Sequence, residues 1–225
     1  MSFKYAALLA AVINFLSSLA MLLFLNPALD PKNSLAAKLQ YLLARPGAWT
    51  GSWILWIFAA LSLILLLIHW GTALDHFTEG RSRPWIIFGT LIACLGLIPD
   101  TIAEVLYLGT LPDLAKQTLA HGDIAAISSR FHDWENTALL LTGFLGNGLY
   151  CLGGLTLQSF TLKYGALPRF CRYFGFVVWI CGLALSTAVL FKSSVGMYLL
   201  TALTMASFIL WSFFLGTLRH PRTSS

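Results

Sequence analysis

Charged side chains are scarce in this sequence. Only 10% of its 225 residues are Asp, Glu, Lys or Arg, whereas a soluble domain carries about 25%. The chain therefore has too little charge to cover a water-facing surface. Hydrophobic residues reach 58% and the mean hydropathy is +0.78. This balance excludes an ordinary soluble enzyme, a disordered tail and a collagen-like chain, and it indicates an integral membrane protein.

Cysteine and the common enzyme motifs are also scarce. The chain has four cysteines, and none of them forms a C-x-x-C pair, so the sequence indicates neither a disulfide framework nor a zinc site. It contains no G-x-S-x-G motif, no phosphate-binding loop and no dinucleotide fingerprint. These absences remove support for a serine hydrolase, a nucleotide hydrolase and a dinucleotide enzyme. Catalytic residues and cofactors therefore stay unassigned.

The basic residues are spread along the chain. The net charge is +5, but Lys and Arg form no run and do not alternate with aromatic residues, as they would in a nucleic-acid-binding segment. We therefore expect the lipid bilayer to be the main partner, and we expect no nucleic-acid partner. The sequence leaves an oligomer open.

Long apolar runs are what the sequence has instead. Each is close to the ~20 residues that cross a bilayer as a helix. The first run is too long for the apolar region of a signal peptide, so we interpret it as a retained span. The sequence predicts an all-α polytopic bundle, a single domain over residues 1–225, with six spans at residues 5–25, 51–72, 84–107, 134–158, 173–191 and 195–218.

The distribution of Lys and Arg predicts the orientation. Six spans place both termini on one side, with eight basic residues: Lys4, Arg81, Arg83, Lys163, Arg169, Arg172, Arg219 and Arg222. The other side has six, diluted over longer connections: Lys32, Lys38, Arg45, Lys116, Arg130 and Lys192. Because Lys and Arg in short loops favour the cytoplasm, we expect a bacterial inner-membrane protein with both termini cytoplasmic.

Two amphipathic helical segments are predicted on the outer side. In residues 30–46, Asp30 and Pro31 predict a helix start, and leucines repeat at helical spacing on one face. In residues 110–131 a helix with Leu114 and Ala115 on its apolar face is expected to stop at Gly122, and Asp123 then caps a short turn with Phe131 on its apolar face. Both segments are too short to span, so we expect two lids that lie over the outer end of the bundle. The simpler interpretation is that they only seal its rim.

The third run carries two acids, Asp100 and Glu104, four residues apart. They share one helical face, which Tyr107 extends. Ionisable residues within a span usually face the bundle interior or a water-filled cavity. Two carboxyls about 6 Å apart do not both ionise easily, so we expect one to hold a proton. This is typical of a proton-coupled or cation site; alternatively, both acids lie at headgroup depth and are merely hydrated.

A second polar cluster opens the fourth run with His132, Asp133, Trp134, Glu135 and Asn136. The structural interpretation makes Asp133 the N-cap, with Glu135 in the first helical turn. The functional interpretation brings His132 and Glu135 beside the third-span acids, where they could bind a divalent cation. No ordered metal signature supports a definite metal site.

Asn147 continues a polar stripe down the fourth span, which is also rich in glycine. Hydrogen bonding between helices is one interpretation of the stripe, and a polar path leading inward is the other. The candidate residues for binding a small molecule or a cation are Asp100, Glu104, Tyr107, His132, Glu135, Asn136 and Asn147.

The layout resembles the uncharacterised bacterial membrane family called domain of unknown function 4386. The similar features are the long first outer connection, Glu104 within Ala103–Leu106, and the basic junction at 163–172 that contains Leu167-Pro168-Arg169. Asp100 and the cluster at His132–Asn136 have no counterpart in this resemblance. It implies a six-span fold and no particular activity.

Three function classes therefore stay open. The protein is a binding or transport protein for a small solute, lipid or ion that uses an outer-facing acidic pocket. Alternatively, it is an intramembrane enzyme with the same acids and a metal, or a structural or accessory subunit whose polar groups only hold helices together.

Overall fold

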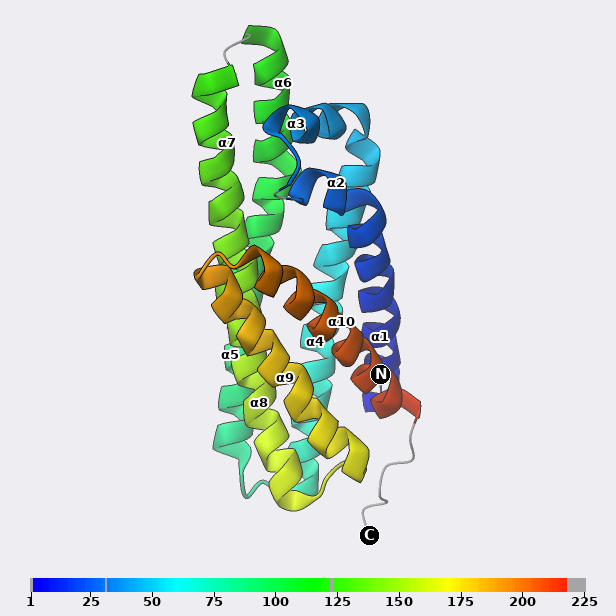
Figure 1. The fold of residues 1–225 in the computed structure, drawn as a ribbon. Helices are drawn as coiled ribbons and strands as arrows, with labels where there is room; N and C mark the ends of the chain where they lie inside the picture. Colours follow the sequence, from blue (N-terminus) through cyan, green and yellow to red (C-terminus); the bar gives the residue numbers. More distant parts are fainter. Residues whose placement is uncertain (1, 31, 122–123, 218–225) are drawn as a thin grey trace.

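A computed structural model of the protein describes residues 2–30, 32–121 and 124–217. Within these ranges every regular element is a helix (Figure 1). Six of the helices are long and apolar enough to cross a membrane: Phe3–Leu29, Pro46–Phe77, Arg83–Gln117, Ser128–Tyr164, Arg169–Leu190 and Ser194–Thr217. The predicted all-α, six-span bundle is confirmed, and the chain is a multi-pass membrane protein.

Three of the spans contain a π-helical segment. The first consists of α1 (Phe3–Ala20), η1 (Met21–Leu25) and α2 (Asn26–Leu29). The third consists of α5 (Arg83–Val105) and η2 (Leu106–Thr110), and continues into α6 (Leu111–His121). The fourth consists of α7 (Ile124–Leu139), η3 (Leu140–Gly146) and α8 (Asn147–Tyr164). The remaining helices are α3 (Leu35–Ala44), α4 (Pro46–Phe77), α9 (Arg169–Leu190) and α10 (Ser194–Thr217).

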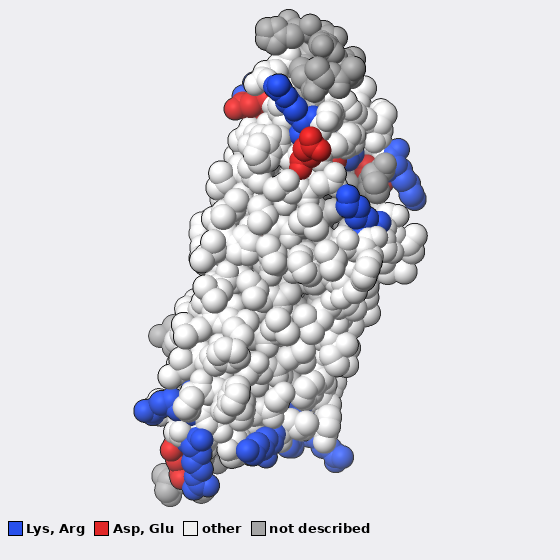
Figure 2. Space-filling view, turned by 90° about the vertical axis from the view of Figure 1, so that its left-hand side faces the viewer, with Lys and Arg blue, Asp and Glu red and all other residues white. Residues whose placement is uncertain are grey.

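The bundle has two distinct ends. We call the end with the α4–α5 and α8–α9 connections the terminal face, because α1 begins and α10 ends toward it (Figure 1). The opposite end, with α3, α6 and α7, is the distal face. Figure 2 shows Lys, Arg, Asp and Glu at these two ends of the visible surface, with a broad band free of them between. Such a band matches the hydrocarbon core of a bilayer.

Both predicted outer segments are helical, but they are arranged differently. The first forms α3, which crosses the distal face as a short separate helix (Figure 1). It starts after Ser34, whose hydroxyl accepts a hydrogen bond from the backbone N–H of Ala37 at 3.3 Å. The predicted start at Asp30 is therefore wrong, and Pro31 lies outside the described residues. Arg219 and Arg222 of the predicted charge distribution also lie outside them.

The second predicted segment does not form a separate lid. Its two halves, α6 and α7, continue the third and fourth spans, and they rise together beyond the turn between α9 and α10 (Figure 1). The helical periodicity is correct, but it does not reveal that η2 joins α5 to α6 without a loop, or that α7 continues without a loop into the fourth span. Gly122 and Asp123 lie outside the described residues. The molecule therefore carries a helical hairpin on its distal face.

Small residues allow α5 and α8 to pack closely. At Gly153 of α8, an added methyl group would lie 2.7 Å from the Ala93 Cβ atom and 2.8 Å from the Ala93 backbone nitrogen. Lipid provides no hydrophobic drive for helix association, so such close backbone contact stabilises the pair. The glycine-rich fourth span packs against α4, α5 and α9 and is therefore central to the bundle.

We expect Gly153→Ala to destabilise the protein by about 1–3 kcal/mol because it overpacks this crossing, although alanine is the better helix former. Gly51→Ala in α4 is the matched control, because no atom lies within 4 Å of its added methyl group. Thermal unfolding of both purified variants in detergent measures the difference. Equal melting temperatures would contradict a tight α5–α8 crossing.

Candidate functional site

The two acids of the third span lie in the protein interior. Asp100 is only 4% exposed, and Glu104 is 0% exposed. Tyr107, one turn further along, is 3% exposed. The structure therefore places these three predicted residues together on one buried face. The acids do not line an open pocket on the distal side; protein encloses them.

Asp100 is held by two hydroxyl groups of the fourth span. Thr142 of η3 donates a hydrogen bond to Asp100 Oδ1, and the Tyr150 hydroxyl of α8 donates to Oδ2 at 3.0 Å. Both carboxyl oxygens thus have a donor. An aspartate with two donors is compatible with negative charge in a buried position, since hydrogen bonds compensate part of the lost hydration.

Two glycines permit this arrangement. A methyl group at Gly96 would lie 2.8 Å from the Gly146 carbonyl oxygen and 2.8 Å from the Tyr150 ring. A methyl group at Gly146 would lie 3.1 Å from Asp100 Cβ. Larger residues at either position would push the two spans apart and separate Asp100 from its donors.

Glu104 has the opposite environment. Both of its carboxyl oxygens are buried and have no hydrogen-bond partner among the described residues. An ionised carboxylate without a partner is very unfavourable in such a place. The enclosed conformation is therefore compatible with the neutral acid, and ionisation of Glu104 requires water or a cation to reach it.

π-Helical segments adjoin both halves of the site. η2 begins two residues after Glu104, and η3 carries Thr142 and Gly146. Single π-helical turns inside α-helices are frequent at functional sites. Here they lie where the third and fourth spans meet, since α5 packs against η3.

An aromatic layer lies on the distal side of Glu104. It consists of Trp49 and Trp53 of α4 and Tyr107 of η2. The Trp53 ring stacks on the Tyr107 ring with centroids 4.1 Å apart, and the Trp49 indole N–H donates to the Tyr107 carbonyl oxygen at 2.7 Å. The indole N–H of Trp53 is buried without a partner among the described residues.

A groove of about 210 Å³ opens above this layer. Trp49 contributes to its lining, together with Leu42, Leu43, Pro46, Thr50, Leu108, Pro112, Asp113 and Lys116. The groove thus lies among α3, α4 and the α6 end of the third span. The aromatic layer extends from Trp49, which lines the groove, to Tyr107, which lies one helical turn after Glu104.

The second predicted cluster forms a separate ionic group. Lys38 of α3 is only 4% exposed, and its Nζ atom lies 2.6 Å from Glu135 Oε1. The other Glu135 oxygen is 3.5 Å from His132 Nδ1. Glu135 therefore ties α3 to α7 and does not join the acid pair. The His132 side chain is 54% exposed, and Asn136 is exposed.

Two predictions about the cluster at His132–Asn136 are wrong. Asp133 is not an N-cap, because α7 begins at Ile124 and Asp133 lies inside it. Across the described ranges, no three His, Cys, Asp or Glu side chains gather as metal ligands, so His132 and Glu135 do not complete a cation site with Asp100 and Glu104.

Asn147 links two helices. Its side-chain amide donates to the Gly182 carbonyl oxygen at 2.7 Å and to the Ser186 hydroxyl at 2.9 Å, both on α9. Of the two interpretations of the fourth-span stripe, this favours hydrogen bonding between helices over a polar path.

The sequence interpretation missed the hydrogen-bond donors of Asp100 and the ion-pair partner of Glu135. Tyr150 and Thr142 are ordinary span residues in the sequence, and only their helical spacing from Gly146 places them on the face that meets α5. From the sequence, Lys38 is expected to face water in the first outer connection. No residue near it in the sequence indicates that it pairs with Glu135. Trp49 and Trp53 fit an interfacial aromatic belt equally well.

Comparison with known proteins adds nothing to this picture. No family model, no curated protein and no solved structure matches the chain. The site is therefore interpreted from its own residues and geometry.

We expect Thr142→Val and Tyr150→Phe each to destabilise the protein by about 1–3 kcal/mol, because each leaves a buried Asp100 oxygen without its donor. Thr137→Val is the matched control: Thr137 is exposed and its hydroxyl donates to a carbonyl of its own helix. Thermal unfolding in detergent compares the three. A Thr142 variant as stable as the Thr137 variant would argue against the Asp100 clamp.

Lys38→Met should reduce the free energy that holds α3 against α7 by about 1–3 kcal/mol. This loss is smaller than for a fully buried ion pair because Glu135 is partly exposed. Hydrogen exchange of residues 35–44, followed by mass spectrometry, should become faster. The double variant Lys38→Met/Glu135→Met should recover slow exchange, because neither charge is then left unpaired.

Lys116→Met serves as the control for this experiment. The Lys116–Asp113 pair is 2.9 Å long, but its two side chains are 68% and 65% exposed. Its loss should leave exchange in residues 35–44 unchanged. If Lys38→Met behaves like this control, the ion pair does not fasten α3.

Proposed function

We propose that this protein binds and transports a small solute or an ion across the membrane, and that protonation of the Asp100–Glu104 pair is coupled to this movement. The observation that carries the proposal is the fully buried Glu104 without a hydrogen-bond partner among the described residues, one helical turn from Asp100. Ionisable groups inside membrane spans commonly serve ion pathways and proton relays.

The energetics of the pair support coupling. Asp100 has two donors and Glu104 has none among the described residues, so the enclosed state favours ionisation of Asp100 over ionisation of Glu104. Loss of the Glu104 proton would place two negative charges about 6 Å apart in a buried site. That state needs hydration or a bound cation, and therefore a different arrangement of the surrounding helices.

The distal groove supports an approach route. It reaches Trp49, and the aromatic layer of Trp49, Trp53 and Tyr107 lies one turn from Glu104. Rearrangement of this layer would expose the acid to the groove. The unpartnered Trp53 indole N–H offers a donor for a ligand that enters there.

The alternative of a metal-dependent enzyme has little support, because the described residues bring no three metal-ligating side chains together. A structural or accessory role is the serious rival, since Asn147 does hold helices together.

We also propose that the protein lies in a bacterial inner membrane with the terminal face in the cytoplasm. The support is the excess of Lys and Arg in the short connections of that face, including Arg81, Lys163 and Arg169. Membership of the family called domain of unknown function 4386 stays a prediction.

The test uses proteoliposomes that contain a pH-sensitive dye. Sodium, potassium, amino acids, sugars and organic acids are added one class at a time, and proton movement is recorded. We expect at least one probe to drive proton movement with the wild type. Glu104→Gln should abolish this movement, and Asp100→Asn should reduce it at least tenfold. Glu79→Gln is the control, because that carboxyl is exposed and lies at the terminal face.

Unfolding measurements separate transport from a structural role. Glutamine is close in size to a neutral Glu104, so Glu104→Gln should change stability by less than about 1 kcal/mol. A structural role predicts lost stability or assembly instead. Normal stability together with unchanged proton movement for every probe would show that the pair has no part in transport.

A further inference from the structure

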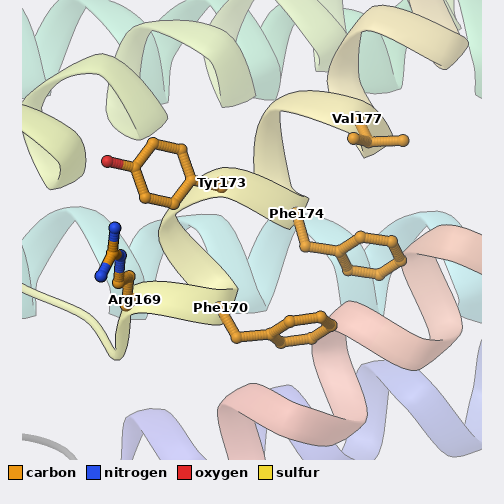
Figure 3. Close-up of a pocket in the computed structure, with 5 residues that line it drawn as sticks. All are labelled: Arg169, Phe170, Tyr173, Phe174 and Val177. Carbon is orange, nitrogen blue, oxygen red and sulfur yellow. The ribbon is translucent and has the colours of Figure 1, made fainter.

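A shallow groove lies on α9 near the terminal face. Its volume is about 520 Å³, and it is lined by Arg169, Phe170, Tyr173, Phe174 and Val177. Figure 3 shows the Arg169 and Tyr173 side chains on one part of the helix and the Phe170 and Phe174 rings on another. The groove thus combines a cationic end with an apolar wall, and it lies within a membrane span.

The apolar wall is well supported. The Phe170 and Phe174 rings stack with centroids 5.0 Å apart, and Phe170 also packs edge-on against Phe214 of α10 at 5.0 Å. Phe170 and Val177 are nevertheless 49% and 45% exposed. In a bilayer, such side chains contact acyl chains.

Among the described residues the cationic end has no counter-ion. The sequence contains no Asp or Glu after Glu135. Two other acids, Asp75 and Glu79, lie in the α4–α5 region of the same face, and they pair with Arg83 and Arg81 at 3.0 Å each.

The unpaired positive charge is concentrated at the α8–α9 junction. Arg169 is exposed and forms no ion pair with any described residue. The Nε atom of Arg172 is buried and has no hydrogen-bond partner among the described residues. Lys163 lies in the last turn of α8. Lys163, Arg169 and Arg172 therefore lie within one stretch of ten residues that contains no acidic residue.

We propose that this groove binds one anionic phospholipid of the leaflet at the terminal face. The Arg169 guanidinium pairs with the headgroup phosphate, for which its planar donors are well suited, and the Tyr173 hydroxyl adds a donor beside it. One acyl chain lies along Phe170, Phe174 and Val177. Basic sites at the membrane surface recognise anionic headgroups in this way.

A phospholipid fits this groove better than a soluble phosphate or a peptide. Most of the lining is aromatic or aliphatic, which a free phosphate cannot use. The apolar part continues along α9 into the span, where an extended peptide would have to leave its backbone hydrogen bonds unsatisfied. The lipid site is independent of Asp100 and Glu104.

Native mass spectrometry tests the proposal with full-length protein released from nanodiscs of equal parts phosphatidylglycerol and phosphatidylcholine. We expect the wild type to retain one phosphatidylglycerol in preference to phosphatidylcholine. Arg169→Gln should weaken this retention about fivefold, the effect of one surface charge. Val177→Trp should weaken it as well, because it fills the groove while keeping every charge.

Arg81→Gln is the matched control, since Arg81 lies at the same face but pairs with Glu79. It should leave retention unchanged. The proposal is overturned if the wild type shows no preference for phosphatidylglycerol, if Arg81→Gln and Arg169→Gln weaken retention equally, or if inorganic phosphate displaces the bound lipid. Should Arg169→Gln fail to fold, Val177→Trp still decides, because unchanged retention in that variant shows that no acyl chain lies in the groove.

Discussion

The close approach of the third and fourth spans is the contact on which the acid site depends. Gly96 and Gly146 let the two backbones meet, and only this separation brings the Thr142 and Tyr150 hydroxyls to Asp100. Glu104, one turn further along α5, is also buried but has no hydrogen-bond partner among the described residues. Packing between small residues therefore supplies donors to Asp100 but not to its neighbour Glu104.

The fold could be predicted from the sequence to a large extent, because apolar runs and scarce charge leave a six-span bundle as the physical solution. Asp100, Glu104 and Tyr107 could also be found, since their spacing alone puts them on one face. Their surroundings could not. Contacts such as Lys38 with Glu135 join residues 97 positions apart, and local patterns carry no information about such pairs.

The charged residues at the two ends of the bundle are arranged differently. At the distal face, Lys38 and Glu135 neutralise each other in a partly buried pair that fastens α3. At the terminal face, Glu79 and Asp75 pair with Arg81 and Arg83, and Arg169 at the α8–α9 junction has no ion-pair partner among the described residues. Contacts within the protein thus neutralise the buried cation at one end, whereas the other end keeps positive charge that the proposed phospholipid would neutralise.

The distal hairpin has a mechanical consequence. α6 joins α5 through η2, and α7 joins α8 through η3, so each arm of the hairpin is continuous with a helix that carries part of the acid site. A force that moved α6 relative to α7 would therefore be transmitted along continuous helices to η2 and η3, and from there to the hydrogen bond between Thr142 and Asp100.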